Sequence, residues 1–396
     1  MVRSVDSSNF FVTYAQQEQT LIPISNSQLN KGMALYADKD YEEAAKAFER
    51  AIEVAPQSEY SASACNYLSM SYLKLEDKDK AIEAYQKWIR LNPEEAEPRL
   101  KLGKLYFDQE RHGEALNEFS EAVRIDPVSV ENYYHLGQAY LAFDRNTEAQ
   151  AQFRKVQQLE PDEPAGYYGL GLAYSKEGRY EQAIDQFDQA IKADRTFYDA
   201  YAEKGYAYAD MGEIEKAEEI QRYLEDEDED LADTLSRYIY KVDTPKIAFG
   251  SAMESTFGYT RKRNTPVSDL DAYLENADAE KQFKMVFQFH KEMDRSSIED
   301  RFNWTIKRTL ADGSGTAYNY GLSVPDTEVS ITSFPDYVYY DKEALTAAVH
   351  FTIQQNASAD GTIDPSHIEF KFTGEDKWGL SMDKDADQFT GFSGVF

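Results

Sequence analysis

Three histidines in the C-terminal part of the chain are the side chains best suited to metal chemistry. His290, His350 and His367 would form a metal site if the fold brought them together, because imidazole is a common metal ligand. His290 and His350, however, fall at positions that point away from the apolar face of their strands. We therefore predict surface histidines and no bound metal ion.

Two groups of carboxylates have the composition of a calcium site but not its spacing. Asp383, Asp385 and Asp387 alternate like the opening of a calcium-binding loop. Gln388 stands where such a loop needs glycine. The six consecutive acidic residues 225–230 lack both the glycine and the fixed ligand spacing. We predict a solvated spacer or a helix start for this run.

The sequence contains no arrangement typical of catalysis. A phosphate-binding glycine loop, a nucleophile elbow and a credible pair of catalytic carboxylates are all missing from it. Cys65 is the only cysteine, so an intrachain disulfide is impossible, and its place among packing residues favours a buried structural thiol. We predict a protein that is not an enzyme and that needs no cofactor.

The charge balance argues against further classes of partner. The chain has 72 acidic and 42 basic residues, which gives a net charge of −30 at pH 7. Nucleic acid and anionic membrane surfaces both require a basic footprint, so we expect neither as a partner. With 42% hydrophobic and 14% aromatic residues the chain can still bury substantial cores. We predict a folded protein that prefers neutral or basic protein partners.

Hydropathy gives little information on the compartment. No apolar run is long enough to span a membrane, and we expect no membrane insertion. The first residues lack the basic region and unbroken apolar core of a secretion signal. A cytoplasmic protein is therefore favoured for the sequence as it stands, and an exported mature form stays open.

A repeated pattern of small, aromatic and alanine residues runs through residues 26–225. One copy consists of Gly103, Tyr106, Ala115, Phe119, Ala122 and Pro127. Six copies align, mostly 34 residues apart, as Gly103 and Gly137 show. Each copy has apolar residues at helical steps in two stretches, and the proline ends the second. One helix hairpin cannot bury its apolar face alone, so the pattern predicts a stack of hairpins.

These residues resemble the signature of the tetratricopeptide repeat (TPR) family over residues 25–226. The resemblance implies an all-α solenoid of six helix hairpins, and Leu231, Leu235 and Ile239 recur at helical steps like a capping helix. It also implies a concave groove, lined by the first helix of each hairpin, that binds a peptide, a helix or a folded partner. It implies no catalysis.

The groove positions follow from the register of the repeats, and packing does not dictate them. They are Asn66, Met70, Leu100, Lys104, Phe107, Tyr134, Gln138, Tyr168, Leu172 and Tyr206. Such apolar and aromatic surface is typical of binding hot spots. The alternative is that the termini of the chain itself cover part of it. Family members that hold acidic chaperone tails use a lysine and asparagine clamp, whereas Leu29 and Met33 stand there in the first repeat.

Residues 1–24 precede the repeats and contain a β-prone run. The run consists of Phe10, Phe11, Val12, Thr13 and Tyr14. Two interpretations are open: this arm packs along the first repeat as a cap, or it adds as a strand to an open sheet edge of this or a neighbouring molecule.

The C-terminal part changes from helical to strand periodicity. Residues 241–279, with prolines, glycines and one basic cluster at 261–263, read as a connector. From residue 280 apolar residues alternate, as in Phe283, Met285 and Phe287. Seven or eight short strands predict an antiparallel β-sandwich of immunoglobulin- or fibronectin-like type over residues 280–396.

The predicted chain is thus a multidomain α + β protein. The domains are the arm, 1–24; the solenoid with its capping helix, 25–240; the connector, 241–279; and the β-sandwich, 280–396. The first functional hypothesis is a scaffold or adaptor that binds a partner segment in the groove. The alternative is a structural protein that self-assembles through the arm or the sandwich. A third, ligand binding at aromatic residues Tyr337, Tyr339 and Trp378, rests on fold analogy.

Overall fold

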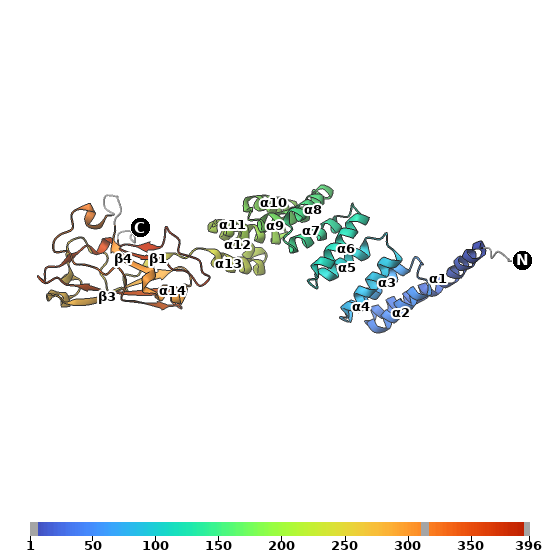
Figure 1. Cartoon of the computed structure of the whole chain (residues 1–396), viewed down its shortest axis with the longest axis horizontal. Coiled ribbons are helices and arrows are strands. Elements are labelled where there is room, and N and C mark those ends of the chain that lie inside the picture. The colour runs from blue at the N-terminus through green and yellow to red at the C-terminus, as the bar shows by residue number, and fades with distance from the viewer. Residues whose placement is uncertain (1–6, 310–316, 392–396) are drawn as a thin grey trace. The chain divides into compact units, whose positions relative to one another are not determined.

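The chain divides into two compact units in the computed structural model (Figure 1). The structure describes residues 7–309 and 317–391, with side chains from residue 21 onward. The helical unit comprises residues 1–235 and the sheet unit comprises residues 236–396.

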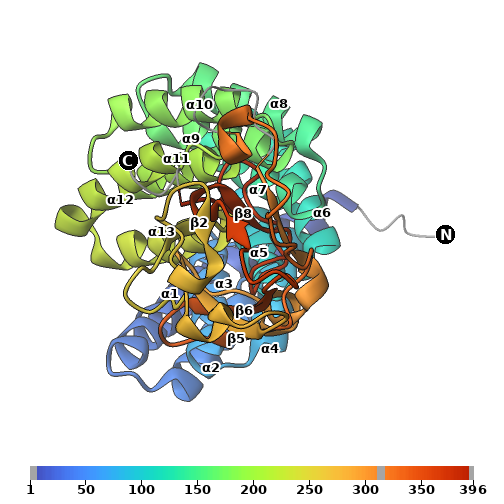
Figure 2. The same ribbon diagram turned by 90° about the vertical axis from the view of Figure 1, so that its left-hand side faces the viewer.

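The helical unit is an array of helix hairpins. The first helices of the hairpins are α1 (Ser7–Ala37), α3 (Ser61–Lys74), α5 (Glu97–Phe107), α7 (Val130–Ala142), α9 (Pro164–Lys176) and α11 (Tyr198–Asp210). The second helices are α2 (Tyr41–Val54), α4 (Lys78–Leu91), α6 (His112–Ile125), α8 (Asn146–Leu159), α10 (Tyr180–Ala193) and α12 (Ile214–Glu227). Helix α13 (Glu229–Val242) follows. Figure 2 shows successive pairs following one another along a curve, which confirms the predicted repeat array.

Glycine and phenylalanine hold each hairpin together. A Cβ atom at Gly137 of α7 would lie 2.7 Å from the ring of Phe153 on α8. Gly169, on α9 of the next repeat, meets the same ring, and a Cβ there would lie 2.4 Å from it. Phe153 is fully buried as a result. The small residue of the repeat pattern is therefore required because two helices approach one ring this closely.

The N-terminal arm is helical, so the predicted β-prone strand is wrong. Helix α1 runs without interruption from Ser7 to Ala37 and includes Phe10 to Tyr14. Extending an existing helix adds one hydrogen bond per residue without a new nucleation step, and this outweighs a weak β propensity. The backbone at residues 10–14 consequently offers no strand for addition to a sheet edge, and residue 24 is no boundary.

The sheet unit contains three antiparallel sheets. The four-stranded sheet has the order β1 (Ile247–Gly250), β3 (Glu280–Phe289), β6 (Thr346–Gln354), β5 (Tyr337–Asp341). The three-stranded sheet has the order β4 (Trp304–Arg308), β8 (Ile368–Phe372), β9 (Gln388–Phe389). Strands β2 (Thr265–Pro266) and β7 (Thr362–Ile363) form the third. The short helices are α14 (Arg295–Glu299), η1 (Val267–Asp269), η2 (Ala272–Glu275), η3 (Arg301–Asn303), η4 (Tyr318–Gly321) and η5 (Pro365–His367).

Aromatic side chains join the two larger sheets into one core. Phe287 of β3 stacks on Trp304 of β4 with ring centroids 5.5 Å apart. Phe351 of β6 meets Phe370 of β8 at 5.3 Å. Alternate residues of each strand supply these rings, as the period of two in the sequence predicts. The antiparallel sheets are confirmed, while the immunoglobulin- or fibronectin-like type stays a prediction.

Residues 241–279 belong to the sheet unit, which corrects the prediction of a connector. Strand β1 pairs with β3, and the amide of Ile247 donates a hydrogen bond to the carbonyl of Ala386 at 2.9 Å. Phe257, Val267 and Leu274 are buried in the core of the unit. The prolines and glycines in this segment mark turns between short elements rather than a linker. The sheet unit therefore starts well before residue 280.

Candidate partner-binding groove

All ten predicted groove residues lie on the first helices of hairpins. Asn66 and Met70 are on α3; Leu100, Lys104 and Phe107 on α5; Tyr134 and Gln138 on α7; Tyr168 and Leu172 on α9; and Tyr206 on α11. Steps of four residues place the members of each helix on one face. Leu100 is buried and the others are partly exposed. Except for Leu100, each predicted residue is therefore accessible to a partner in the helical unit taken by itself.

The polar groups on α3 and α5 already have partners. Lys104 forms an ion pair with Glu131. The ammonium group of Lys101 donates to Asn66 Oδ1 at 3.0 Å and pairs with Glu97 at 2.8 Å. The charges of this half of the groove are thus neutralised within the chain, and they offer little attraction to a charged ligand.

Three tyrosines occupy equivalent groove positions on α7, α9 and α11. The ring of Tyr134 contacts Phe153 at 5.8 Å, and the ring of Tyr168 contacts Phe197 at 4.9 Å. Burial raises the pKa of the Tyr168 hydroxyl, and the charges of Glu203 and Asp199 raise it further. The neighbouring hydroxyls of Tyr134 and Tyr206 act in the same direction. These hydroxyls and the two carboxylates therefore share one electrostatic environment.

Two carboxylates complete this region, and sequence reasoning missed both. Asp199 and Glu203 lie one turn apart on α11. Within the described part of the chain neither makes a hydrogen bond or an ion pair with a side chain or a backbone group. Burial, and then the charge of Asp199, raises the pKa of Glu203 to about 7. We call the set of Tyr134, Tyr168, Tyr206, Asp199 and Glu203 the tyrosine–carboxylate cluster.

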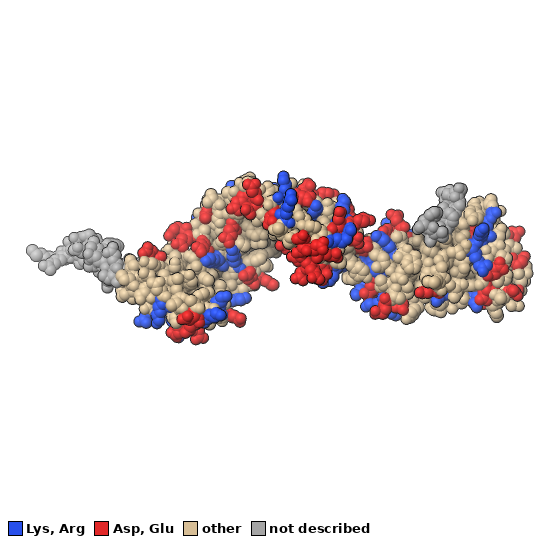
Figure 3. Space-filling model, turned by 180° about the vertical axis from the view of Figure 1, so that it is seen from behind, with Lys and Arg blue, Asp and Glu red and all other residues tan. Residues whose placement is uncertain are grey.

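A pocket opens beside Tyr134, near the starts of α7 and α9. Its volume is about 610 Å³, and its lining consists of Asp126, Val128, Ser129, Val130, Glu131, Tyr134, Glu160 and Ala165. Apolar side chains with a few polar groups are typical of a site for a side chain or short segment. Figure 3 shows that acidic side chains, drawn in red, also gather on the helical unit more widely.

The register of the repeats contains a signal for part of this site. Glu131, Ala165 and Asp199 occupy the same position in successive repeats, 34 residues apart. That position lies three residues before the first groove tyrosine of its helix in α7 and α9. The same alignment that located Tyr134 and Tyr168 could therefore have located Asp199. Glu203 has no such signal, because charged residues on helices are usually solvated.

The histidines do not form a metal site, and one prediction about them is wrong. His367 is buried rather than on the surface, and its ring lies 3.1 Å from Asp364 Oδ1 and 2.9 Å from the hydroxyl of Ser366. His290 and His350 are partly buried. No group of three or more histidine, cysteine, aspartate or glutamate residues suited to a metal ion occurs among residues 7–309 and 317–391.

Two other predicted features agree with the structure. Cys65 is buried, and its burial raises the thiol pKa to about 12, so it is a packing residue with little reactivity. The acidic run includes a helix start, since the side chain of Asp228 accepts a hydrogen bond from the amide of Leu231 at 3.1 Å.

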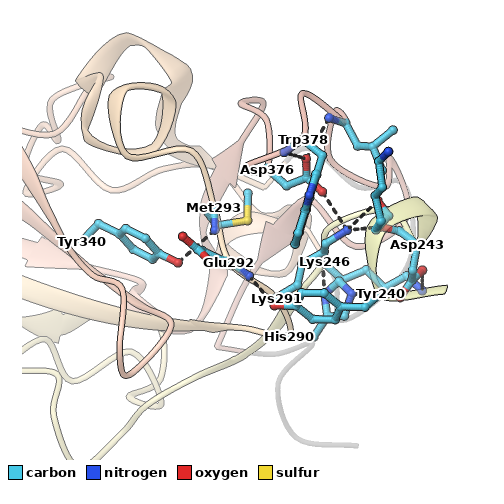
Figure 4. Close-up of polar contacts among 12 residues, drawn as sticks. Tyr240, Asp243, Lys246, His290, Lys291, Glu292, Met293, Tyr340, Asp376 and Trp378 are labelled. Atoms are coloured by element: carbon cyan, nitrogen blue, oxygen red, sulfur yellow. Dashed lines mark hydrogen bonds and ion pairs between the residues drawn. The ribbon is translucent and has the colours of Figure 1, made fainter. Parts of the chain in front are cut away.

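A buried ion pair in the sheet unit has a structural role (Figure 4). Lys291 Nζ lies 2.7 Å from Asp376 Oδ2, and both side chains are completely buried. Lys291 also donates to the carbonyl of Asp243 and lies 4.8 Å from the ring of Trp378. Trp378 packs against Tyr240 at 5.2 Å, so it is a packing residue and not the exposed ligand-binding aromatic of the third hypothesis.

The stacked helix hairpins and their accessible inner helices define a helical-repeat solenoid protein. Models described as tetratricopeptide repeat match residues 23–94, 134–196 and 168–232, and one described as TPR repeat matches residues 103–142. The chain belongs to the tetratricopeptide repeat family. Proteins of this family act in protein–protein interaction, and none of the matching models describes a catalytic family. A search of curated protein sequences gives no match.

Solved structures of repeat proteins are similar to the chain. The MamA protein is 28% identical, with 44% of this chain and 96% of that chain covered and a TM-score of 0.40. A tetratricopeptide repeat protein from Parabacteroides merdae is 15% identical, with 55% and 88% covered and a TM-score of 0.48. YrrB, a TPR protein with an unusual peptide-binding site, is 22% identical, with 44% and 88% covered and a TM-score of 0.38.

Membrane-spanning helices require both length and apolar character. Within residues 7–309 and 317–391, no helix combines the two to the degree needed to cross a bilayer.

Proposed function

We propose that the protein is a non-enzymatic scaffold or adaptor that holds a segment of a partner protein in the groove of the helical unit. The observation that carries the proposal is the row formed by Tyr134, Tyr168 and Tyr206, which adjoins the pocket of about 610 Å³. Family membership supports the class of function, and this row supports the position of the site.

The tyrosines are suited to binding because their rings are held in place before a partner arrives. Phe153 packs against Tyr134 and Phe197 packs against Tyr168. Ordering a side chain on binding typically costs about 0.5–1.5 kcal/mol, and a ring already fixed avoids part of that loss. A row of such rings, partly exposed, presents apolar area together with hydroxyl groups, as binding hot spots do.

The test compares capture of partner proteins by groove variants and a matched control. Tyr134→Ala and Tyr168→Ala should each weaken binding by about 10-fold or more, since truncating a hot-spot side chain typically costs about 2 kcal/mol. Tyr223→Ala makes the same change at an exposed tyrosine of α12 and should have little effect. Proteins captured from lysate by the full chain would be identified and purified. Their affinities for all four proteins would then be measured by titration.

The proposal fails if every purified partner binds the two groove variants as tightly as the unaltered chain. Weaker binding by all three variants alike would indicate a general loss of structure, and circular dichroism and thermal unfolding of each variant separate that case from loss of the site.

A second candidate, self-assembly, is favoured by aromatic residues exposed on the sheet unit. Tyr337 and Tyr339 on β5 are 48% and 56% exposed, and Phe302 is 63% exposed. β5 is an edge strand, but Glu299 accepts from the amide of Tyr340, and Arg295 donates to its carbonyl. These side chains occupy backbone groups that a further strand would need. Any self-contact here would therefore use the aromatic face rather than strand addition.

Light scattering after size exclusion distinguishes this candidate from the first. A self-assembling chain should give a mass that rises with concentration, and Tyr337→Ser with Tyr339→Ser should return it to the mass of one chain. A mass of one chain at every concentration rules out self-assembly and leaves the groove as the site to study.

A further inference from the structure

We infer that the segment bound in the groove is cationic, and that an arginine or lysine side chain of the partner lies against Tyr134 and Tyr168 while Asp199 and Glu203 bind its charge. This inference rests on the proposed function of the groove and adds the chemistry of the partner.

The available charge differs between the two halves of the groove. On α5 the lysines are already paired, Lys104 with Glu131 and Lys101 with Glu97. On α11 the carboxylates of Asp199 and Glu203 have no cation or hydrogen-bond donor within the described part of the chain. A like-charged pair in a partly desolvated place favours a ligand that brings positive charge. An acidic segment would meet repulsion there.

The groove tyrosines differ from other tyrosines of the helical unit in having no cation of their own. Elsewhere the chain supplies one: Arg111 lies 4.3 Å from the ring of Tyr106, and Arg179 lies 4.3 Å from that of Tyr174. Such contacts are favourable because the face of the ring is negative. Within the described residues, Tyr134 and Tyr168 have no cation over their rings. These two rings are therefore left for a cation from another molecule.

The pocket beside Tyr134 is lined by carboxylates as well as valines. Asp126, Glu131 and Glu160 are among its lining residues, together with Val128 and Val130. Only Glu131 of the three carboxylates has a lysine partner among the described residues. A long side chain with an apolar stem and a cationic head matches this lining, because its methylene groups can lie against the valines. The pocket and the cluster thus favour the same class of side chain.

The test uses random 12-residue peptides displayed on phage and selected on the full chain. Parallel selections use a variant with Asp199→Asn and Glu203→Gln, which keeps the shape of both side chains. A matched control carries Glu218→Gln and Glu219→Gln, two exposed positions of α12, and so has the same net charge. We expect arginine and lysine to be enriched in peptides selected by the unaltered chain and by the control, and not by the groove variant.

Affinities of the selected peptides complete the test. A selected cationic peptide should bind the groove variant about 10-fold or more weakly, and its binding should weaken as salt is added. Equal affinity for the unaltered chain and the groove variant overturns the inference. Neutral or acidic peptides that lose affinity on Tyr134→Ala would also overturn it while the proposed function stands.

Two further outcomes would assign the groove differently. If no selected peptide depends on Tyr134 or Tyr168, the groove is not a peptide site, and the proposed function fails as well. If the chain self-associates and Arg261→Gln with Arg263→Gln abolishes this, the occupant is the basic cluster of a second copy. That result would overturn the assignment to a separate partner.

Discussion

At the scale of single residues, Glu203 stabilises the fold less than an ordinary surface glutamate does. Its pKa in the folded chain is about 7, against an ordinary value of 4.5. Between these two pH values the folded chain binds more protons than the unfolded chain, so stability falls as pH rises through this window. A residue that destabilises its own fold is often kept for function.

Glu203→Gln should therefore stabilise the helical unit in a pH-dependent way. The gain should reach up to about 3 kcal/mol at pH 8, because one pKa unit corresponds to about 1.4 kcal/mol, and should be below about 1 kcal/mol at pH 5. Urea unfolding followed by circular dichroism at the two pH values would measure it. An equal gain at both would show that the charge of Glu203 is not the cause.

Lys291 provides the opposite case, a buried charge that its partners satisfy. Lys291→Met should destabilise the sheet unit by about 3–5 kcal/mol, because it leaves Asp376 buried without its cation. Adding Asp376→Asn should recover part of this loss, since an amide oxygen can still accept from the amides of Trp378 and Leu380. Urea unfolding followed by tryptophan fluorescence gives the measurement.

A matched control is the exposed ion pair between Lys377 and Glu292. Lys377→Met should change stability by less than about 1 kcal/mol, as is usual for exposed pairs. If Lys291→Met had a similarly small effect, the buried pair would not be important for stability.

At the scale of elements, the closeness of paired helices sets which side chains the repeats accept. Gly137→Ala should destabilise the helical unit by about 1–3 kcal/mol, because the new Cβ atom would overlap the ring of Phe153. Gly113, near the start of α6, has no atom within less than 4.0 Å of an added Cβ. Gly113→Ala should therefore be neutral or stabilise by up to about 1 kcal/mol. Thermal unfolding of both variants tests the comparison, and an equal loss in the two would contradict it.

The elements also show how far prediction from the sequence could reach. The hairpins were predictable because each copy repeats the same types within 34 residues, so their packing partners are local. Strand β1 was not, because it has only four residues and its partner β3 lies some thirty residues further on. In α1, helix extension overrode the β propensity of residues 10–14.

The candidate site divides in the same way. Its tyrosines were predictable because their positions follow from the repeat. Glu203 was not, since only the fold shows that this carboxylate is partly buried beside Asp199 without a cation. His367 is a similar case: its contact with Asp364 forms within η5 and gives no periodic signal in the sequence.

At the scale of the whole molecule, the net charge of −30 and the groove point to the same kind of partner. The acidic surface slows the approach of polyanions and speeds that of cationic proteins. The tyrosine–carboxylate cluster would then hold a cation at short range. Long-range attraction and local recognition thus favour one class of ligand, and salt should weaken both.

The hydrogen bond between Ile247 and Ala386 has a consequence for synthesis on the ribosome. It joins the first strand of the sheet unit to a residue near the end of the chain. Each helix hairpin contacts its sequence neighbours and can fold as it emerges, whereas the sheet unit must wait for its last strand. The helical unit should therefore reach its folded state while β1 is still without its full set of neighbours. A ribosome that pauses within the last fifty or so codons would leave a folded groove attached to an incomplete sheet unit, with its aromatic core exposed to chaperones.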